Sequence, residues 1–129
     1  MNSSKHVLAS KREAERRGRR GETFAALLLM SKGYRILGRR VRTHAGEIDL
    51  IVRAPSGVIC FVEVKSRTGH SRAIESLGNR QQLRIARAAE LYLARRPGLA
   101  AKGVRFDTVT LAPRAWPKHI RDAWRPGAA

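Results

Sequence analysis

Apolar residues recur with the spacing of an amphipathic helix in two segments of this sequence. In residues 19–32, larger apolar side chains share one face, and Gly33 follows as a typical C-terminal stop. The two faces of this segment are Phe24, Leu27 and Leu28 on one side and Glu22, Ala25, Ala26 and Leu29 on the other. Residues 80–95 repeat the same spacing and precede a Pro-Gly pair. The pattern predicts a helix in each segment.

Four other segments carry β-branched and aromatic residues between turn signals, which is typical of strands. They are residues 34–42, 46–53, 58–67 and 103–112. Between the last two, residues 68–79 show weak periodicity, and we expect a loop there. Near the end of the chain, residues 118–124 are expected to form a short helical turn.

The predicted elements follow the order α-β-β-β-α-β. The first three strands can form an antiparallel meander, whereas the fourth follows a helix and must return parallel to one of them. This order predicts an α/β fold with three layers around a mixed sheet. A length of 129 residues suits one domain. We place it at residues 16–124, with a flexible basic tail at 1–15 and a short tail at 125–129.

The turn between the second and third strands fixes which residues face each other. Pro55-Ser56-Gly57 suits a three-residue hairpin loop, because proline fits the first turn position and glycine the left-handed one. That loop pairs Ala54 with Val58. Counting back along both strands places Asp49 opposite Glu63, and directly opposed side chains share a face.

The same register places Glu47 opposite Lys65. The carboxylates of Asp49 and Glu63 therefore meet across the hairpin, and Lys65 lies beside them. Adjacent carboxylates repel unless a cation lies between them, and a few carboxylate oxygens suit Mg²⁺ or Mn²⁺. Such a site fits metal-assisted phosphodiester hydrolysis. The alternative is a structural cluster, in which Glu47 pairs with Lys65 or Arg67 and Asp49 lies on a solvated face.

The chain is strongly basic, with 27 Lys and Arg residues against 10 Asp and Glu and a formal net charge of +17. A surplus of this size on one small domain favours a polyanionic partner. Nucleic acid is the first candidate because phosphate neutralisation releases counterions. An anionic membrane surface is the second candidate, and a generally arginine-rich proteome is the alternative explanation.

The location of the protein also follows from the sequence. The N-terminal residues lack the apolar stretch of a secretory signal, and no segment has the length of a membrane span. Cys60 is the single cysteine, so it has no internal disulfide partner, and no Cys/His cluster suggests zinc. We therefore expect a cytoplasmic protein in which Cys60 is a small buried hydrophobe.

An aspartate at 49, a short hairpin and Glu63-Val64-Lys65 resemble the PD-(D/E)XK signature of the restriction-endonuclease-like fold, with Ile48 where the proline usually stands. Further blocks in the same order resemble the YraN-type family of small bacterial endonuclease-like proteins. These blocks are GE at 21–22, GYRIL at 33–37, GEIDLI at 46–51, FVEVKSR at 61–67, YL at 92–93, RFD at 105–107 and HIRDAW at 119–124. The resemblance spans residues 15–124.

This resemblance implies a fold similar to that of Holliday junction resolvases and a nuclease that requires Mg²⁺ or Mn²⁺. It implies that Asp49 and Glu63 are metal ligands, that Lys65 is the catalytic lysine and that Glu22 is an additional acid at the metal. The expected substrate is branched or structured DNA, and a homodimer is an alternative to a monomer. The chain departs from the family pattern at Arg80, where a lysine is usual, and at residues 39–40.

We expect nucleic acid to contact basic residues near this site and one glutamine of the second helix. They are Arg19, Arg20, Arg39, Arg40, Arg67, Arg80 and Gln82. Gln81 and Gln82 could reach the site from the second helix; the alternative is that they are ordinary polar residues on the surface. We interpret Asp107 with Arg105 as a strand ion pair, and His119 as a packing or capping residue rather than a general base.

Two other functions remain open at this point. The first is a DNA-binding module that keeps the nuclease fold without catalysis. The second is a basic adaptor that binds RNA or ribosomes. Intact acids at 49 and 63 with a lysine at 65 favour the nuclease, because a binding module would be free to lose them.

Overall fold

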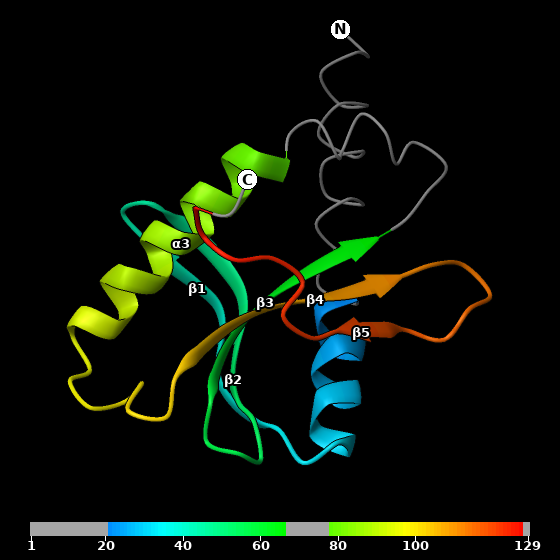
Figure 1. The fold of residues 1–129 in the computed structure, drawn as a ribbon. Coiled ribbons are helices and arrows are strands. Elements are labelled where there is room, and N and C mark those ends of the chain that lie inside the picture. The colour runs from blue at the N-terminus through cyan, green and yellow to red at the C-terminus, as the bar shows by residue number, and fades with distance from the viewer. Residues whose placement is uncertain (1–20, 67–77, 128–129) are drawn as a thin grey trace, which may run out of the picture.

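The computed structural model describes residues 21–66 and 78–127. Helical residues 21–31 precede the first strand, and the remaining elements follow along the chain (Figure 1). They are β1 (Arg35–Thr43), β2 (Gly46–Arg53), β3 (Ile59–Ser66), α3 (Gly78–Ala94), β4 (Val104–Leu111) and β5 (Lys118–Ile120). The two predicted helices and four predicted strands are thus confirmed within the described ranges, with ends that move by one or two residues.

One mixed sheet of five strands runs in the order β1-β2-β3-β4-β5. All neighbouring strands are antiparallel except β3 and β4, which are parallel from Ile59 opposite Val104 to Ser66 opposite Leu111. This pair confirms the predicted crossover, because the strand that follows α3 returns parallel to the strand before it.

The fifth strand corrects the sequence prediction of a helical turn at residues 118–124. Lys118–Ile120 pairs antiparallel with β4, with His119 opposite Val109. Three residues are too few for a recognisable period, and the strand forms because β4 offers an unpaired edge. A buried side-chain contact of His119, described below, holds it there.

Each face of the sheet is covered by one helix (Figure 1). The 21–31 helix contributes Ala25, Ala26 and Leu29 to a buried cluster with alternate residues of β2 and β3. On the other face, α3 packs through Ile85, Ala88, Ala89 and Tyr92 against Ile51, Ile59 and Phe61. Residues that alternate along a strand point to opposite faces, so β2 and β3 serve both cores.

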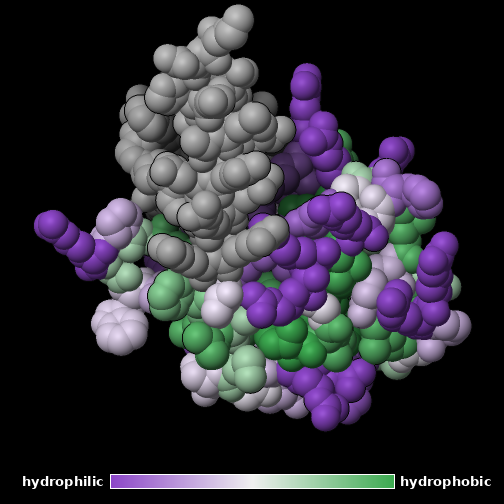
Figure 2. Space-filling view, turned by 180° about the vertical axis from the view of Figure 1, so that it is seen from behind, coloured by the Kyte–Doolittle hydropathy of each residue, from purple (hydrophilic) through white to green (hydrophobic). Residues whose placement is uncertain are grey.

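The 21–31 helix turns its small-residue face to the sheet and leaves larger apolar side chains in solvent. Phe24 and Leu27 are 59% and 57% exposed, whereas Ala25 and Leu29 are fully buried. Hydrophobic side chains also reach the surface among strongly hydrophilic ones on the face drawn in Figure 2. The orientation of this helix matters for function because Glu22 belongs to its buried face.

The exit from this helix explains how the chain enters β1. The Gly33 amide donates to the Met30 carbonyl and the Tyr34 amide to the Leu29 carbonyl, each at 3.0 Å. Gly33 has a φ of +86°, so this is the glycine-terminated motif that the sequence predicts. No helix in residues 21–66 and 78–127 is long and apolar enough to cross a membrane.

The β2–β3 hairpin confirms the register derived from its turn. The Ala54 amide donates to the Val58 carbonyl at 2.9 Å, and Gly57 has a φ of +93°. The ladder then continues through Arg53 opposite Ile59 to Leu50 opposite Val62. The pairing of β2 with β3 ends at Leu50, one position before Asp49.

Candidate metal centre

Asp49 lies where β2 and β3 stop pairing. Its Oδ2 atom accepts a hydrogen bond from the backbone amide of Val64 at 2.8 Å, so a side chain takes the place of a ladder carbonyl. This bond anchors the carboxylate between the two strands. One carboxylate oxygen, Oδ1, remains available for another partner.

Three carboxylates converge at this point. Oxygen atoms of Glu22, Glu47 and Asp49 all lie within 4.8 Å of one another. Glu22 comes from the buried face of the 21–31 helix, whereas Glu47 and Asp49 are two residues apart on β2. Glu22 is buried, Asp49 is half-buried and Glu47 is exposed, so the cluster opens to solvent on one side.

Arg40 of β1 neutralises part of this cluster. Its Nε atom lies 2.7 Å from Glu22 Oε2, in a hydrogen-bonded ion pair. Arg40 falls between Arg39, opposite Leu50, and Val41, opposite Ile48, so it occupies the position across from Asp49. Its φ of +50° is uncommon for a residue other than glycine and directs the side chain toward the acids.

Glu63 and Lys65 form a second group beside the cluster. Glu63 is only 4% exposed, and its Oε2 atom lies 3.8 Å from Lys65 Nζ. The Oε1 atom is buried and has no hydrogen-bond partner among the described residues. A buried carboxylate oxygen without a donor is costly, so this atom is suited to receive a ligand.

Burial raises the pKa values of three of these acids. Desolvation is the largest cause of the raised pKa of Glu22, with Arg40 acting against it. Desolvation also raises the pKa of Asp49, against the hydrogen bond from Val64. For Glu63, desolvation raises the pKa, Lys65 opposes it, the Asp49 charge adds to it, and a hydrogen bond from Gln81 lowers it. Without a further cation, ionisation of these acids therefore lowers the stability of the folded protein.

We expect Glu63→Gln to stabilise the metal-free protein at neutral pH. A carboxyl group whose pKa is higher in the folded state favours folding below its unfolded pKa and opposes it above. Glutamine keeps the shape of the side chain but removes the desolvated charge, a change of about 1 kcal/mol in the free energy of unfolding. Urea denaturation with a chelator present measures it.

The gain should shrink as the pH falls through the raised pKa of folded Glu63, and it should vanish below the ordinary glutamate value of 4.5, where wild-type Glu63 is protonated in both states. Glu90→Gln is the control, because it removes an exposed carboxylate of α3 and changes the net charge equally. A Glu63→Gln protein less stable than this control at neutral pH would contradict the assignment of strain to Glu63.

The predicted acids therefore lie close together, but in a different grouping. Glu47 belongs to the three-carboxylate cluster and pairs with Arg42 at 3.5 Å, whereas Lys65 pairs with Glu63. From the sequence, a pair of Glu47 with Lys65 or Arg67 was one alternative, and Gln81 was a residue that could reach the site from the second helix. The helical spacing of residues 80–95 was the available signal for Gln81, which lies in the first turn of α3.

The expected nucleic-acid contacts are spread over several elements. Arg39 donates to Thr23 Oγ1 at 3.0 Å, and Arg40 is held by Glu22. Arg80 is exposed in the first turn of α3, and Gln82 is half-buried. The other three residues, Arg19, Arg20 and Arg67, lie outside the described residues.

A separate buried network surrounds Asp107 on β4. Arg105 donates to both of its oxygens at 2.8 and 2.9 Å, and His119 Nε2 lies 2.8 Å from Oδ2. The backbone amide of Asp122 donates to Oδ1 at 3.0 Å. These bonds hold the pKa of Asp107 at about 2, although desolvation acts to raise it. The predicted Arg105 ion pair is confirmed, and His119 is buried in it.

This network joins separate elements of the fold. Arg105 also donates to the Tyr34 hydroxyl at 2.8 Å, and the Tyr34 and His119 rings meet edge to face. It thereby ties β5 and the start of β1 to β4. Cys60 is fully buried, as the sequence predicts, and burial raises the pKa of its thiol to about 11, so it is not a nucleophile at neutral pH.

The sequence matches one family model and many relatives. Residues 21–111 match a family described as uncharacterised protein family UPF0102. A UPF0102 protein of Parvibaculum lavamentivorans is 51% identical over 113 residues, which cover 88% of this chain and 84% of that protein. One from Paramagnetospirillum magneticum is 52% identical over 116 residues, with 87% and 89% covered. One from Maricaulis maris is 46% identical over 118 residues, with 92% of each covered.

Proposed function

The chain belongs to the UPF0102 family, and from that premise we propose that it is a nuclease that uses Mg²⁺ or Mn²⁺ to hydrolyse phosphodiester bonds in DNA. The observation that carries the proposal is the convergence of the Glu22, Glu47 and Asp49 carboxylates. The names of the relatives assign no activity, so the argument rests on the chemistry of these residues.

The donor set fits a hard divalent cation. Mg²⁺ binds oxygen ligands at about 2.0–2.1 Å in octahedral geometry, so two of its ligands lie at most about 4.2 Å apart. Ligands at right angles lie only about 3 Å apart, so the three oxygens, which lie within 4.8 Å of one another, would have to move closer by side-chain rotation to bind one ion. Few protein ligands leave positions for water and for phosphate oxygens. The cluster contains neither cysteine nor histidine, which argues against a zinc site.

The residues around the cluster have separate tasks in this proposal. Glu22, Glu47 and Asp49 would hold the metal, and the unpaired Oε1 of Glu63 supplies a further acceptor close by. A bound Mg²⁺ or Mn²⁺ would supply charge stabilisation to a phosphate and a more acidic water. Lys65 is held near Glu63 and is partly exposed, so its ammonium can contact a phosphate oxygen.

The fold and the charge support the same proposal. A mixed sheet with one helix on each face is compatible with the restriction-endonuclease-like arrangement that the sequence motif implies. The net charge of +17 favours a polyanionic substrate. Branched or structured DNA, a homodimeric state and a cytoplasmic location remain parts of this proposal.

A non-catalytic DNA-binding module is the second candidate. It is favoured by the ion pair of Arg40 with Glu22, which neutralises one acid of the cluster without a metal. In that case the acids and Arg40 would form a structural group, and added Mn²⁺ would bind no more tightly than to an exposed carboxylate. Metal binding therefore separates the two candidates.

Calorimetric titration with Mn²⁺ tests the site directly. We expect one site in the wild-type protein, and Asp49→Asn should weaken it at least tenfold, on the order of the effect of losing a ligand or its immediate support. Because the acids bind protons more strongly than usual, metal must displace protons, and the affinity should rise with pH.

Asp122→Asn is the matched control, because it removes an exposed carboxylate outside the cluster. Equal Mn²⁺ affinity in the wild-type, Asp49→Asn and Asp122→Asn proteins would reject the metal site. The binding-module alternative would then remain, with the DNA affinity of the same three proteins as its test.

A further inference from the structure

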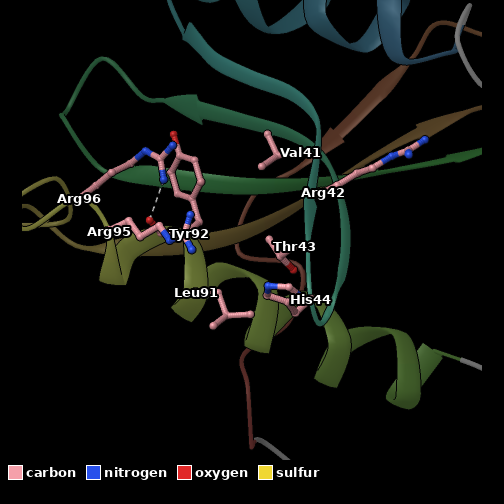
Figure 3. Close-up of a pocket in the computed structure, with 8 residues that line it drawn as sticks. All are labelled: Val41, Arg42, Thr43, His44, Leu91, Tyr92, Arg95 and Arg96. Atoms are coloured by element: carbon pink, nitrogen blue, oxygen red, sulfur yellow. Dashed lines mark hydrogen bonds between the residues drawn. The ribbon is translucent and has the colours of Figure 1, made fainter.

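A basic pocket lies between the C-terminal half of α3 and the β1–β2 hairpin, apart from the acidic cluster (Figure 3). Its volume is about 430 Å³. The hairpin contributes Thr43 and His44, and the helix side contributes Leu91, Tyr92, Arg95 and Arg96. None of these residues was singled out for binding from the sequence.

Arg96 is fixed in this pocket, and no acid in the described part of the chain pairs with it. Its guanidinium carbon lies 3.7 Å from the centre of the Tyr92 ring, and Nη1 donates to the Tyr92 carbonyl at 3.0 Å. Stacking and one hydrogen bond orient the planar group and use one of its five N–H donors. The other donors of this preorganised arginine can bind an anion with little further loss of side-chain entropy.

The pocket walls carry a second arginine and a histidine. Arg95 on the helix side and His44 on the hairpin lie on opposite sides of the pocket (Figure 3). In the described part of the chain, no ion pair involves His44, Arg95 or Arg96. Five of the seven acids there pair elsewhere: Glu22, Glu47, Glu63, Asp107 and Asp122. A concave surface with uncompensated positive charge attracts an anion.

The pocket and the acidic cluster share the β1–β2 hairpin. Arg42 also lines the pocket, but its side chain points away from Tyr92 and Arg96 (Figure 3). It pairs at 3.5 Å with Glu47, which belongs to the acidic cluster. The cation-lined pocket therefore stands on one side of the hairpin tip, and the carboxylates stand on the other.

We propose that this pocket binds a phosphate group of a nucleic-acid backbone that crosses the β1–β2 hairpin to the acidic cluster. The inference rests on the proposed function for its ligand, since a polynucleotide presents phosphates on both sides of the hairpin. Guanidinium groups match phosphate oxygens bidentately, and the Thr43–His44 segment closes the opposite wall. The contact positions the strand and is independent of base sequence.

A purely structural role for these arginines makes a different prediction. Arg95 and Arg96 directly follow Ala94, the last residue of α3, where cations stabilise the partial negative charge of the helix end. If that were their whole role, their loss would lower the melting temperature. Nucleic-acid affinity would then fall only as much as in a variant that loses two arginines elsewhere.

The test compares two double variants of the full chain by fluorescence anisotropy with a labelled duplex oligonucleotide, without divalent metal. Arg95→Gln/Arg96→Gln removes the pocket cations. Arg35→Gln/Arg114→Gln removes two exposed arginines from the start of β1 and the β4–β5 connection. We expect the pocket variant to bind about tenfold more weakly at low salt, with a slope of log affinity against log salt lower by about one to two units.

The control should retain most of the affinity, and melting temperatures show whether both variants fold. Equal loss of affinity in the two variants would overturn the pocket, because only total charge would then matter. Loss of binding to phosphatidylglycerol vesicles, with oligonucleotide affinity equal to that of the control, would also overturn it and assign the pocket to lipid headgroups. If the wild-type protein bound no oligonucleotide, the proposed function itself would fail.

Discussion

Lys65→Ala is expected to reduce metal-dependent DNA cleavage by about 10²–10³-fold, the effect of removing one donor aimed at developing transition-state charge. The Lys65 ammonium lies 3.8 Å from Glu63, and under the proposed function it would act where charge develops on the phosphate. Affinity for DNA should change little, because the variant removes one charge from a surplus of seventeen. Single-turnover cleavage of duplex, flap and four-way junction DNA with Mg²⁺ and Mn²⁺ measures the effect.

Lys102→Ala serves as the matched control, because Lys102 is exposed in the connection from α3 to β4. It removes the same charge away from the cluster and should leave the cleavage rate unchanged. Cleavage that survives in Lys65→Ala would show that the activity comes from another site or another protein. Tight binding without cleavage of any substrate would favour the non-catalytic module.

Asp107→Ala should lower the free energy of unfolding by about 3–5 kcal/mol, the usual cost of removing one partner of a buried ion pair. Asp107 is fully buried and accepts hydrogen bonds from Arg105 and from the backbone of Asp122, with His119 at 2.8 Å. Its loss leaves the Arg105 guanidinium partly buried without a carboxylate and releases the contact that holds β5. Urea denaturation at neutral pH measures the change.

The same network predicts how the free energy of unfolding depends on pH. The pKa of Asp107 falls from 3.8 to about 2 on folding, so its contribution is present above the unfolded value and is lost as pH falls through about 2. The Asp107→Ala protein should lack this loss. Asp122→Asn, which removes an exposed carboxylate, keeps the backbone amide and suits the positive φ of this residue, should behave like the wild type. Equal stability of Asp107→Ala and wild type would contradict the assigned role.

The fold was predictable where local patterns and tertiary packing agree. Turn chemistry at Pro55-Ser56-Gly57 set the β2–β3 register, and the helical faces placed Glu22 among residues that pack on the sheet. Asp49 and Glu63 could then be placed near each other. The parallel return of β4 followed from the order of the elements alone.

The grouping of the acids required tertiary information. The extended register assumes a continuous ladder, but the pairs stop at Leu50 opposite Val62, and the Asp49 side chain accepts the Val64 amide. Arg40 lies across from Asp49 in the β1–β2 register and pairs with Glu22, and no local signal indicates its positive φ. β5 was missed because its short segment gains order from the buried network at Asp107.

If the proposed site binds a metal, the ion pair between Arg40 and Glu22 would make metal uptake an exchange rather than a simple addition. The guanidinium is a tethered counter-ion, so its local concentration at Glu22 is fixed by the chain and does not fall on dilution. A divalent ion that binds the carboxylates would compete with this internal cation. The binding free energy measured in solution would be the difference between the two interactions. The apparent metal affinity would thus be set by β1 as well as by the ligands.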